Sequence, residues 1–269
     1  MSSAVALHHA ASGPDLPAGA PALVFLHYYA GSLLAWDGVA AELSLAHRCL
    51  AADLRGFGAS PAPAAGYAVA DMADDVLALV DELALGGPGG RFVLVGHSMG
   101  GKVATAAAAR RPPGLAGLVL VAPSPPTPEP MTEVSRARTL ASYGQRAAAE
   151  ETARRITRRP LAPPAFARVV EDSLRTSRPA WDAWMREGSR EDLAALAGRV
   201  DVPTLVVAGG ADPVMDRGML EREVRDRIRG ARMVVVDGVG HLVPYEAADE
   251  LAGHVRAFLG ALPPGAPPA

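Results

Sequence analysis

Two hydrophobic patterns alternate along the chain. Short runs are nearly continuous in Val, Leu and Ala, and longer Ala/Leu-rich segments repeat their apolar positions every three to four residues. The first pattern is typical of strands buried on both faces, and the second of helices packed on one side. The sequence predicts strands over residues 4–9, 22–27, 47–53, 91–96, 115–122, 204–209 and 232–237, and helices over 33–43, 70–83, 99–110, 217–229 and 247–259.

This alternation predicts an α/β fold, in which a mostly parallel sheet has helices on both faces. Between residues 123 and 202 the strand pattern disappears, and a proline-rich opening leads into Arg/Ala/Glu-rich helical segments interrupted by prolines. Because strands resume at 204, we interpret this region as a helical cap inserted into the core. The predicted division is a core over 1–123 and 202–262, a cap over 124–201, and a disordered tail over 263–269, which reads PPGAPPA.

The helix predicted over 70–83 illustrates the amphipathic pattern. Its apolar residues recur at helical spacing, and we expect its acidic residues to lie largely on the opposite, polar face. These acidic residues are Asp71, Asp74, Asp75 and Asp81.

Composition narrows the class of protein. With 269 residues, 49% hydrophobic and 20% charged, the chain falls in the globular range. A net charge of −3 gives no positive field for nucleic acid, so we expect no nucleic-acid partner. The apolar runs are too short for a membrane helix. Cys49, the single cysteine, and the absence of a secretory signal pattern predict a cytoplasmic protein.

The segment RFVLVGHSMGGK predicts a catalytic nucleophile. It has the form strand, G-x-S-x-G, helix, with Gly96 and Gly100 on either side of Ser98. A nucleophile on such a sharp turn needs small neighbours, because the strand and the helix approach each other closely there.

A serine hydroxyl needs a base and an orienting carboxylate, since it is a poor nucleophile at neutral pH. Asp212 follows the strand predicted over 204–209, and His241 lies in a glycine-flanked loop after the strand predicted over 232–237. The order Ser, Asp, His is the one expected for this kind of sheet. Two other carboxylates compete for the acid role: we expect Asp216 to cap the next helix and Asp237 to end its strand.

Five motifs in a fixed order resemble the α/β-hydrolase-fold serine hydrolases that carry a helical cap. They are HYYAGS (27–32), DLRGFGAS (53–60), GHSMGG (96–101), GGADPV (209–214) and GVGHLVPYE (238–246). The resemblance implies that Ser98 is the nucleophile, His241 the general base and acid, and Asp212 the orienting carboxylate.

The same resemblance implies an oxyanion hole made by the backbone N–H groups of Tyr29 and Met99. The chain departs from the family at Tyr28, where glycine is usual. We expect Tyr28, Trp181 and Trp184 to contact substrate, with simple packing under or within the cap as the alternative. For the DLRGFGAS motif we expect a structural loop, in which its arginine and carboxylate tie neighbouring turns together.

The predicted function is cleavage of a small carboxylic ester or lactone through an acyl-enzyme. No cofactor is expected, because the dinucleotide fingerprint is absent, and no metal, because the histidines and the cysteine lack ligand spacing. A carbon–carbon bond hydrolase and a perhydrolase or haloperoxidase-like enzyme use the same residues. A third alternative is a ligand-sensing binding protein. The predicted partner is a small-molecule substrate; the sequence assigns no oligomeric state.

Overall fold

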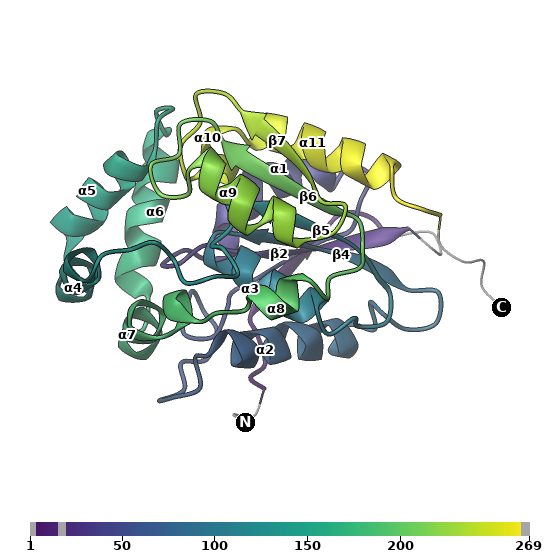
Figure 1. Ribbon diagram of the computed structural model, residues 1–269, viewed down its shortest axis with the longest axis horizontal. Coiled ribbons are helices and arrows are strands. Elements are labelled where there is room, and N and C mark those ends of the chain that lie inside the picture. Colours follow the sequence, from purple (N-terminus) through teal and green to yellow (C-terminus); the bar gives the residue numbers. More distant parts are fainter. Residues whose placement is uncertain (1–3, 16–19, 265–269) are drawn as a thin grey trace.

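The computed structural model describes residues 4–15 and 20–264. These residues form a twisted sheet of seven strands at the centre of the molecule (Figure 1). The strand order is β1-β3-β2-β4-β5-β6-β7, and only the β1–β3 pair is antiparallel. The predicted α/β class is therefore confirmed. The strands are β1 (His9–Ser12), β2 (Pro21–Leu26), β3 (Cys49–Ala52), β4 (Arg91–His97), β5 (Leu115–Val121), β6 (Thr204–Gly209) and β7 (Arg232–Val236).

Helices cover both faces of the sheet and enclose two hydrophobic cores. Successive strand residues point to opposite sides, so Val24 and Leu26 join one core, whereas Leu23 and Phe25 join the other. The first core packs against α2 (Val69–Glu82), α3 (Met99–Ala108), α8 (Ala194–Ala197) and α9 (Arg217–Glu223). The second packs against η1 (Leu33–Trp36), α1 (Asp37–Leu43), α10 (Val243–Glu246) and α11 (Ala248–Gly260).

All the regular elements between β5 and β6 are helices. Four of them, α4 to α7, lie together at one end of the molecule (Figure 1). The division into core and cap at residues 124 and 201 stays a prediction. These elements are α4 (Glu133–Ala141), α5 (Arg146–Ile156), α6 (Pro163–Arg175), α7 (Arg178–Arg186), η2 (Gly188–Arg190) and α8, which packs on α3 of the core.

The strand predicted over residues 4–9 is wrong in position, because β1 begins only at His9. The preceding backbone donates mainly to side chains: the His8 N–H donates to Ser60 Oγ at 2.8 Å and the Val5 N–H to Asp75 Oδ1 at 2.7 Å, while His8 O accepts from the Asp53 N–H, just after β3, at 2.9 Å. A further short helix, η3 (Arg225–Arg227), follows α9 where one continuous helix was predicted. Most of the predicted tail, 265–269, lies outside the described residues, as do residues 1–3 of the core.

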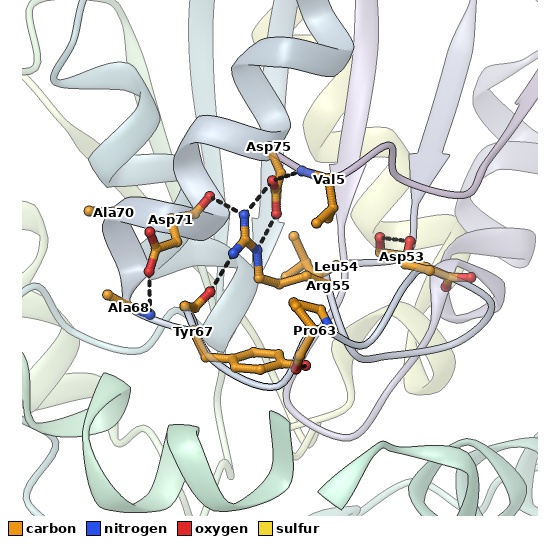
Figure 2. Close-up of polar contacts among 12 residues, drawn as sticks. Val5, Asp53, Leu54, Arg55, Pro63, Tyr67, Ala68, Ala70, Asp71 and Asp75 are labelled. Atoms are coloured by element: carbon orange, nitrogen blue, oxygen red, sulfur yellow. Dashed lines mark hydrogen bonds and ion pairs between the residues drawn. The ribbon is translucent and has the colours of Figure 1, made fainter. Parts of the chain in front are cut away.

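Asp75 on α2 is buried, which corrects the prediction that it lies on the polar face of that helix. Its side chain is 0% exposed and receives two hydrogen bonds from Arg55, Nε to Oδ2 and Nη2 to Oδ1, each at 2.5 Å (Figure 2). Asp53 has different donors, accepting from the N–H groups of Leu33 and Ala59. The predicted structural loop is present: the arginine ties it to α2 and to Gly66, and the Asp53 carboxylate ties it to the backbone at Leu33.

Removing the Asp75 carboxylate should be strongly destabilising, because it takes the paired carboxylate away from the buried Arg55 charge. We expect Asp75→Ala to lower the free energy of unfolding by about 3–5 kcal/mol in urea denaturation. The matched control is Asp74→Ala, whose partner is Arg110 and whose side chain is 39% exposed. We expect this surface pair to contribute no more than about 1 kcal/mol. Equal losses in the two variants would contradict the account.

Candidate active site

Ser98 occupies a strained turn between β4 and α3. Its backbone has φ 51° and ψ −117°, a conformation that non-glycine residues rarely adopt. The neighbouring glycines are required by close backbone contacts. A Cβ on Gly96 would lie 2.3 Å from Gly100 O, and a Cβ on Gly100 would lie 2.4 Å from Leu26 O. The turn therefore holds the serine hydroxyl at the carboxyl edge of the sheet.

The structure brings Asp212 and His241 to Ser98 in one hydrogen-bonded line. Asp212 follows β6 and His241 follows β7, and both strands end at the same edge as β4. His241 Nδ1 lies 2.8 Å from Asp212 Oδ2, and His241 Nε2 lies 3.0 Å from Ser98 Oγ. All three residues are buried: Ser98 is 6% exposed, Asp212 7% and His241 4%.

The hydrogen bonds decide which ring nitrogen of His241 carries the proton. An ionised carboxylate can only accept, so Nδ1–H donates to Asp212 and the lone pair of Nε2 faces the Ser98 hydroxyl. The other Asp212 oxygen, Oδ1, accepts from the N–H groups of Val214 and Met215, at 2.7 and 3.0 Å. These bonds fix the carboxylate in the orientation that His241 needs.

Asp216, the nearest competing carboxylate, has the role that its position predicts. It is the N-cap of α9, and its Oδ1 accepts from the Met219 N–H at 3.0 Å. The prediction that it caps this helix is confirmed.

The two backbone N–H groups that the resemblance assigns to the oxyanion hole lack acceptors in the described part of the chain. Among the described residues, neither the Tyr29 N–H nor the Met99 N–H donates a hydrogen bond, although Met99 is fully buried. Buried N–H groups without an acceptor are rare in folded proteins. Such donors are therefore available to an oxygen atom that enters the site.

Tyr28 and Tyr29 point to different surroundings. The Tyr28 ring is buried in the second core with its centroid 5.2 Å from that of His97, and its hydroxyl has no partner in the described part of the chain. The Tyr29 ring instead meets α7, where its hydroxyl donates to Trp181 O at 3.0 Å. Burial raises the pKa of both tyrosines well above the ordinary value, so both are neutral.

Trp181 and Trp184, both on α7, pack against the Tyr29 ring. Their ring centroids lie 5.2 and 6.5 Å from that of Tyr29, and both tryptophans are buried. Trp181 Nε1 donates to Thr139 O, and the Trp184 ring packs against Gly188. The packing that the sequence allowed as an alternative is thus observed, and contact with substrate stays a prediction for both, as for Tyr28.

Sequence reasoning missed Glu129, which is linked to Ser98 through Ser124. The Ser124 N–H donates to Ser98 O at 3.0 Å, and Ser124 Oγ donates to Glu129 Oε1 at 2.6 Å. Burial raises the pKa of the Glu129 carboxyl. The only available signal was a single acidic residue within the proline-rich segment PSPPTPEP (123–130).

Lys102 was also missed as a structural residue, although it is the only lysine of the chain. It is buried on α3, and its ammonium donates to Thr127 O and Glu191 O, at 3.2 and 2.7 Å. It thereby links the helix after Ser98 to both ends of the segment between β5 and β6. Burial lowers the pKa of Lys102 to about 8.

This depressed pKa predicts a pH dependence of stability. Between about pH 8 and 10, Lys102 loses its proton in the folded protein but keeps it in the unfolded chain. The free energy of unfolding therefore increases with rising pH. Relative to Lys102→Met, wild type should gain about 1–2 kcal/mol between pH 7.5 and 9.5 in urea denaturation. Other titrating groups are common to both proteins. A difference that stays constant with pH would contradict the prediction.

A surface cavity of about 250 Å³ lies apart from this site. It is formed by β1, η1, α1 and β3, and its lining includes Leu33, Trp36 and Cys49 but none of the three aligned residues.

Within the described ranges, no cluster of three or more His, Cys, Asp or Glu could hold a metal ion. The same residues contain no helix long and apolar enough to span a membrane.

Comparison with known proteins identifies the family. A model of the alpha/beta hydrolase family matches residues 23–254, which is most of the chain. The chain belongs to the alpha/beta hydrolase family of enzymes, as its motifs predicted.

Solved structures resemble the chain over nearly its whole length. The enol-lactonase from Burkholderia xenovorans LB400 is 28% identical with a TM-score of 0.82, covering 94% of this chain and 96% of that one. A thermophilic esterase from Thermogutta terrifontis is 26% identical with a TM-score of 0.78, covering 94% and 93%.

A curated relative matches a shorter part. The 2-succinyl-6-hydroxy-2,4-cyclohexadiene-1-carboxylate synthase of Salmonella agona (strain SL483) is 41% identical over 115 residues, which are 42% of this chain and 42% of the relative. The chain thus spans less than half the length of the curated relatives that it matches first.

Proposed function

We propose that this alpha/beta hydrolase is a serine hydrolase that cleaves a small carboxylic ester or lactone through an acyl-enzyme. The observation that carries the proposal is the hydrogen-bonded line Asp212–His241–Ser98, with distances of 2.8 and 3.0 Å, on a turn of strained backbone. A nucleophile, a base and an orienting carboxylate within hydrogen-bond reach are what acyl transfer requires.

In the proposed first step, Ser98 Oγ attacks the substrate carbonyl while its proton passes to His241 Nε2. Asp212 stabilises the resulting imidazolium through Nδ1–H. The Tyr29 and Met99 N–H groups receive the negative charge that develops on the carbonyl oxygen. A donor of this kind typically stabilises the transition state by about 3 kcal/mol.

The second half of the proposed reaction releases the acyl group. His241 gives its proton to the leaving alkoxide, which departs as an alcohol, or stays attached when the substrate is a lactone. A water molecule then loses a proton to His241 and attacks the ester carbonyl on Ser98. Collapse of this intermediate returns the proton to Ser98 and frees the carboxylic acid.

The substrate class is supported by the site and by two similar structures. These are the enol-lactonase and the esterase, which are 28% and 26% identical to this chain and share its fold over 94% of its length. We further propose that residues 124–201 act as the cap, with Tyr29, Trp181 and Trp184 providing apolar contacts for the acyl or leaving group.

The experiment is a hydrolysis assay with p-nitrophenyl acetate, followed by acyl and aryl esters of graded chain length and simple lactones. We expect turnover of short esters or lactones by protein whose circular dichroism shows it to be folded. Folded protein without ester or lactone turnover would overturn the proposal. Binding of such compounds without turnover would favour the ligand-sensing alternative, because a binding role needs neither base nor acid.

A further inference from the structure

Glu246, at the end of α10, is a buried carboxylate that accepts four main-chain hydrogen bonds. Its Oε2 accepts from the N–H groups of Gly240, Arg158 and Arg159, at 2.8, 2.7 and 2.9 Å, and its Oε1 accepts from the Leu242 N–H at 3.0 Å. The residue is 9% exposed. The four N–H groups therefore share one acceptor side chain.

The four donors belong to two segments far apart in the sequence. Gly240 and Leu242 are the residues on either side of His241. Arg158 and Arg159 belong to the link between α5 and α6, in the region proposed as the cap. One carboxylate therefore holds the loop of the proposed base and a segment of the cap together.

The same two segments also contact each other directly. The His241 N–H donates to Ile156 O, the last residue of α5, at 2.7 Å. Gly240 leaves no room between them, because a Cβ there would lie 2.5 Å from Ile156 O. The position of the His241 backbone thus depends on the placement of residues 156–159.

We propose that Glu246 is a positioning residue for His241, and that it couples docking of residues 156–159 to alignment of the imidazole with Ser98 and Asp212. The alignment part rests on the proposed function, in which His241 is the base. Within the described part of the chain, Glu246 makes no hydrogen bond to the side chains of Ser98, Asp212 or His241. When segment 156–159 moves away, the N–H groups beside His241 lose a shared anchor and the imidazole loses its fixed place.

The test is Glu246→Gln, which keeps the shape of the side chain but replaces one acceptor oxygen with an NH₂ donor that faces N–H groups. We expect kcat for p-nitrophenyl acetate to fall at least about tenfold, since misplacing a catalytic group by an ångström can cost about a hundredfold. We expect KM to change less than about threefold, because Glu246 does not contact the substrate.

Two further readouts do not depend on turnover. The first is the proton NMR signal of His241 Nδ1–H, assigned by its loss in Asp212→Asn, which should broaden or disappear in Glu246→Gln. The second is trypsin cleavage of the Arg158–Arg159 bond, which should become faster once the N–H groups of this exposed segment lose their acceptor. A side chain needed only for overall stability would move neither readout in folded protein.

The matched control is Glu250→Gln, which makes the same chemical change at a half-exposed carboxylate paired with the side chain of Arg159. We expect its kcat and its His241 signal to match wild type. Folded Glu246→Gln with an unchanged kcat and signal would overturn the proposal, and a lost signal without faster cleavage would overturn the coupling.

If Glu246→Gln does not fold, Gly240→Ala tests the same contact from the other side, because its Cβ would lie 2.5 Å from Ile156 O and 3.0 Å from Glu246 Oε1 while the carboxylate itself is retained. It should show the same loss of kcat, loss of the His241 signal and faster cleavage, and an unchanged result in folded protein would overturn the proposal. Wild-type protein without ester turnover would contradict the proposed function instead, while the NMR and cleavage results would still decide the role of Glu246.

Discussion

Ser98→Ala should abolish ester hydrolysis, with kcat falling at least about 10⁴-fold. The hydroxyl oxygen proposed as the nucleophile is then absent, and the N–H groups proposed as the oxyanion hole can only stabilise slow attack by water. The fold should persist, because among the described residues the Ser98 hydroxyl is hydrogen-bonded to His241 alone and alanine has the same backbone strain at φ 51°. We expect the thermal midpoint to change by no more than about 4 °C. Initial rates with p-nitrophenyl acetate and a calorimetric melt measure both quantities.

The control for Ser98→Ala is Ser44→Ala, at the end of α1, where the hydroxyl donates to Ala41 O. This variant should keep full activity. Retained hydrolysis in Ser98→Ala, after exclusion of contaminating esterase by repeated purification, would refute Ser98 as the nucleophile.

Asp212→Asn should lower kcat by about 10⁴-fold, although the side chain keeps its size. An asparagine amide can donate a hydrogen bond to His241 Nδ1, which favours the tautomer with the proton on Nε2. That proton faces Ser98 Oγ, so the imidazole can no longer accept the hydroxyl proton. Single-turnover measurements should place the loss in the formation of the acyl-enzyme.

Asp216→Asn is the matched control, four residues further along the chain. Asp216 caps α9 and is not part of the hydrogen-bonded line, so this variant should keep its kcat within about twofold. If Asp216→Asn instead lost activity and Asp212→Asn kept it, the acid assignment would be wrong.

The sequence predicted the central sheet well, because strands buried on both faces leave a continuous apolar run that is hard to mistake. Residues 91–97 and 204–209 are such runs, and their strands lie at or within one residue of the predicted bounds. The first strand was displaced because its position depends on hydrogen bonds to Ser60 and Asp75, which no local pattern records.

In the candidate site, too, some residues could be predicted from the local sequence and others could not. Ser98, Asp212 and His241 could be predicted because each follows a recognisable strand, and parallel strands end at one edge. Asp75, Glu129 and Glu246 could not, because nothing in their local sequence indicates burial. Asp75 lies on the buried face of α2, where its carboxylate accepts from Arg55 and from the Val5 N–H, two partners that the helical pattern does not record. The acceptor role of Glu246 depends on Arg158 and Arg159, 88 and 87 residues away in the sequence.

The central claim, that Ser98 is a nucleophile activated by its neighbours, is tested most directly by labelling with a serine-directed phosphonate. The label should be read by mass spectrometry of the tryptic peptide 92–102, in which Ser98 is the only hydroxyl-bearing residue. We predict one phosphonyl group per chain, located on this peptide and lost in Ser98→Ala. Folded protein that takes up no label, or takes it up only on other peptides, would contradict the account.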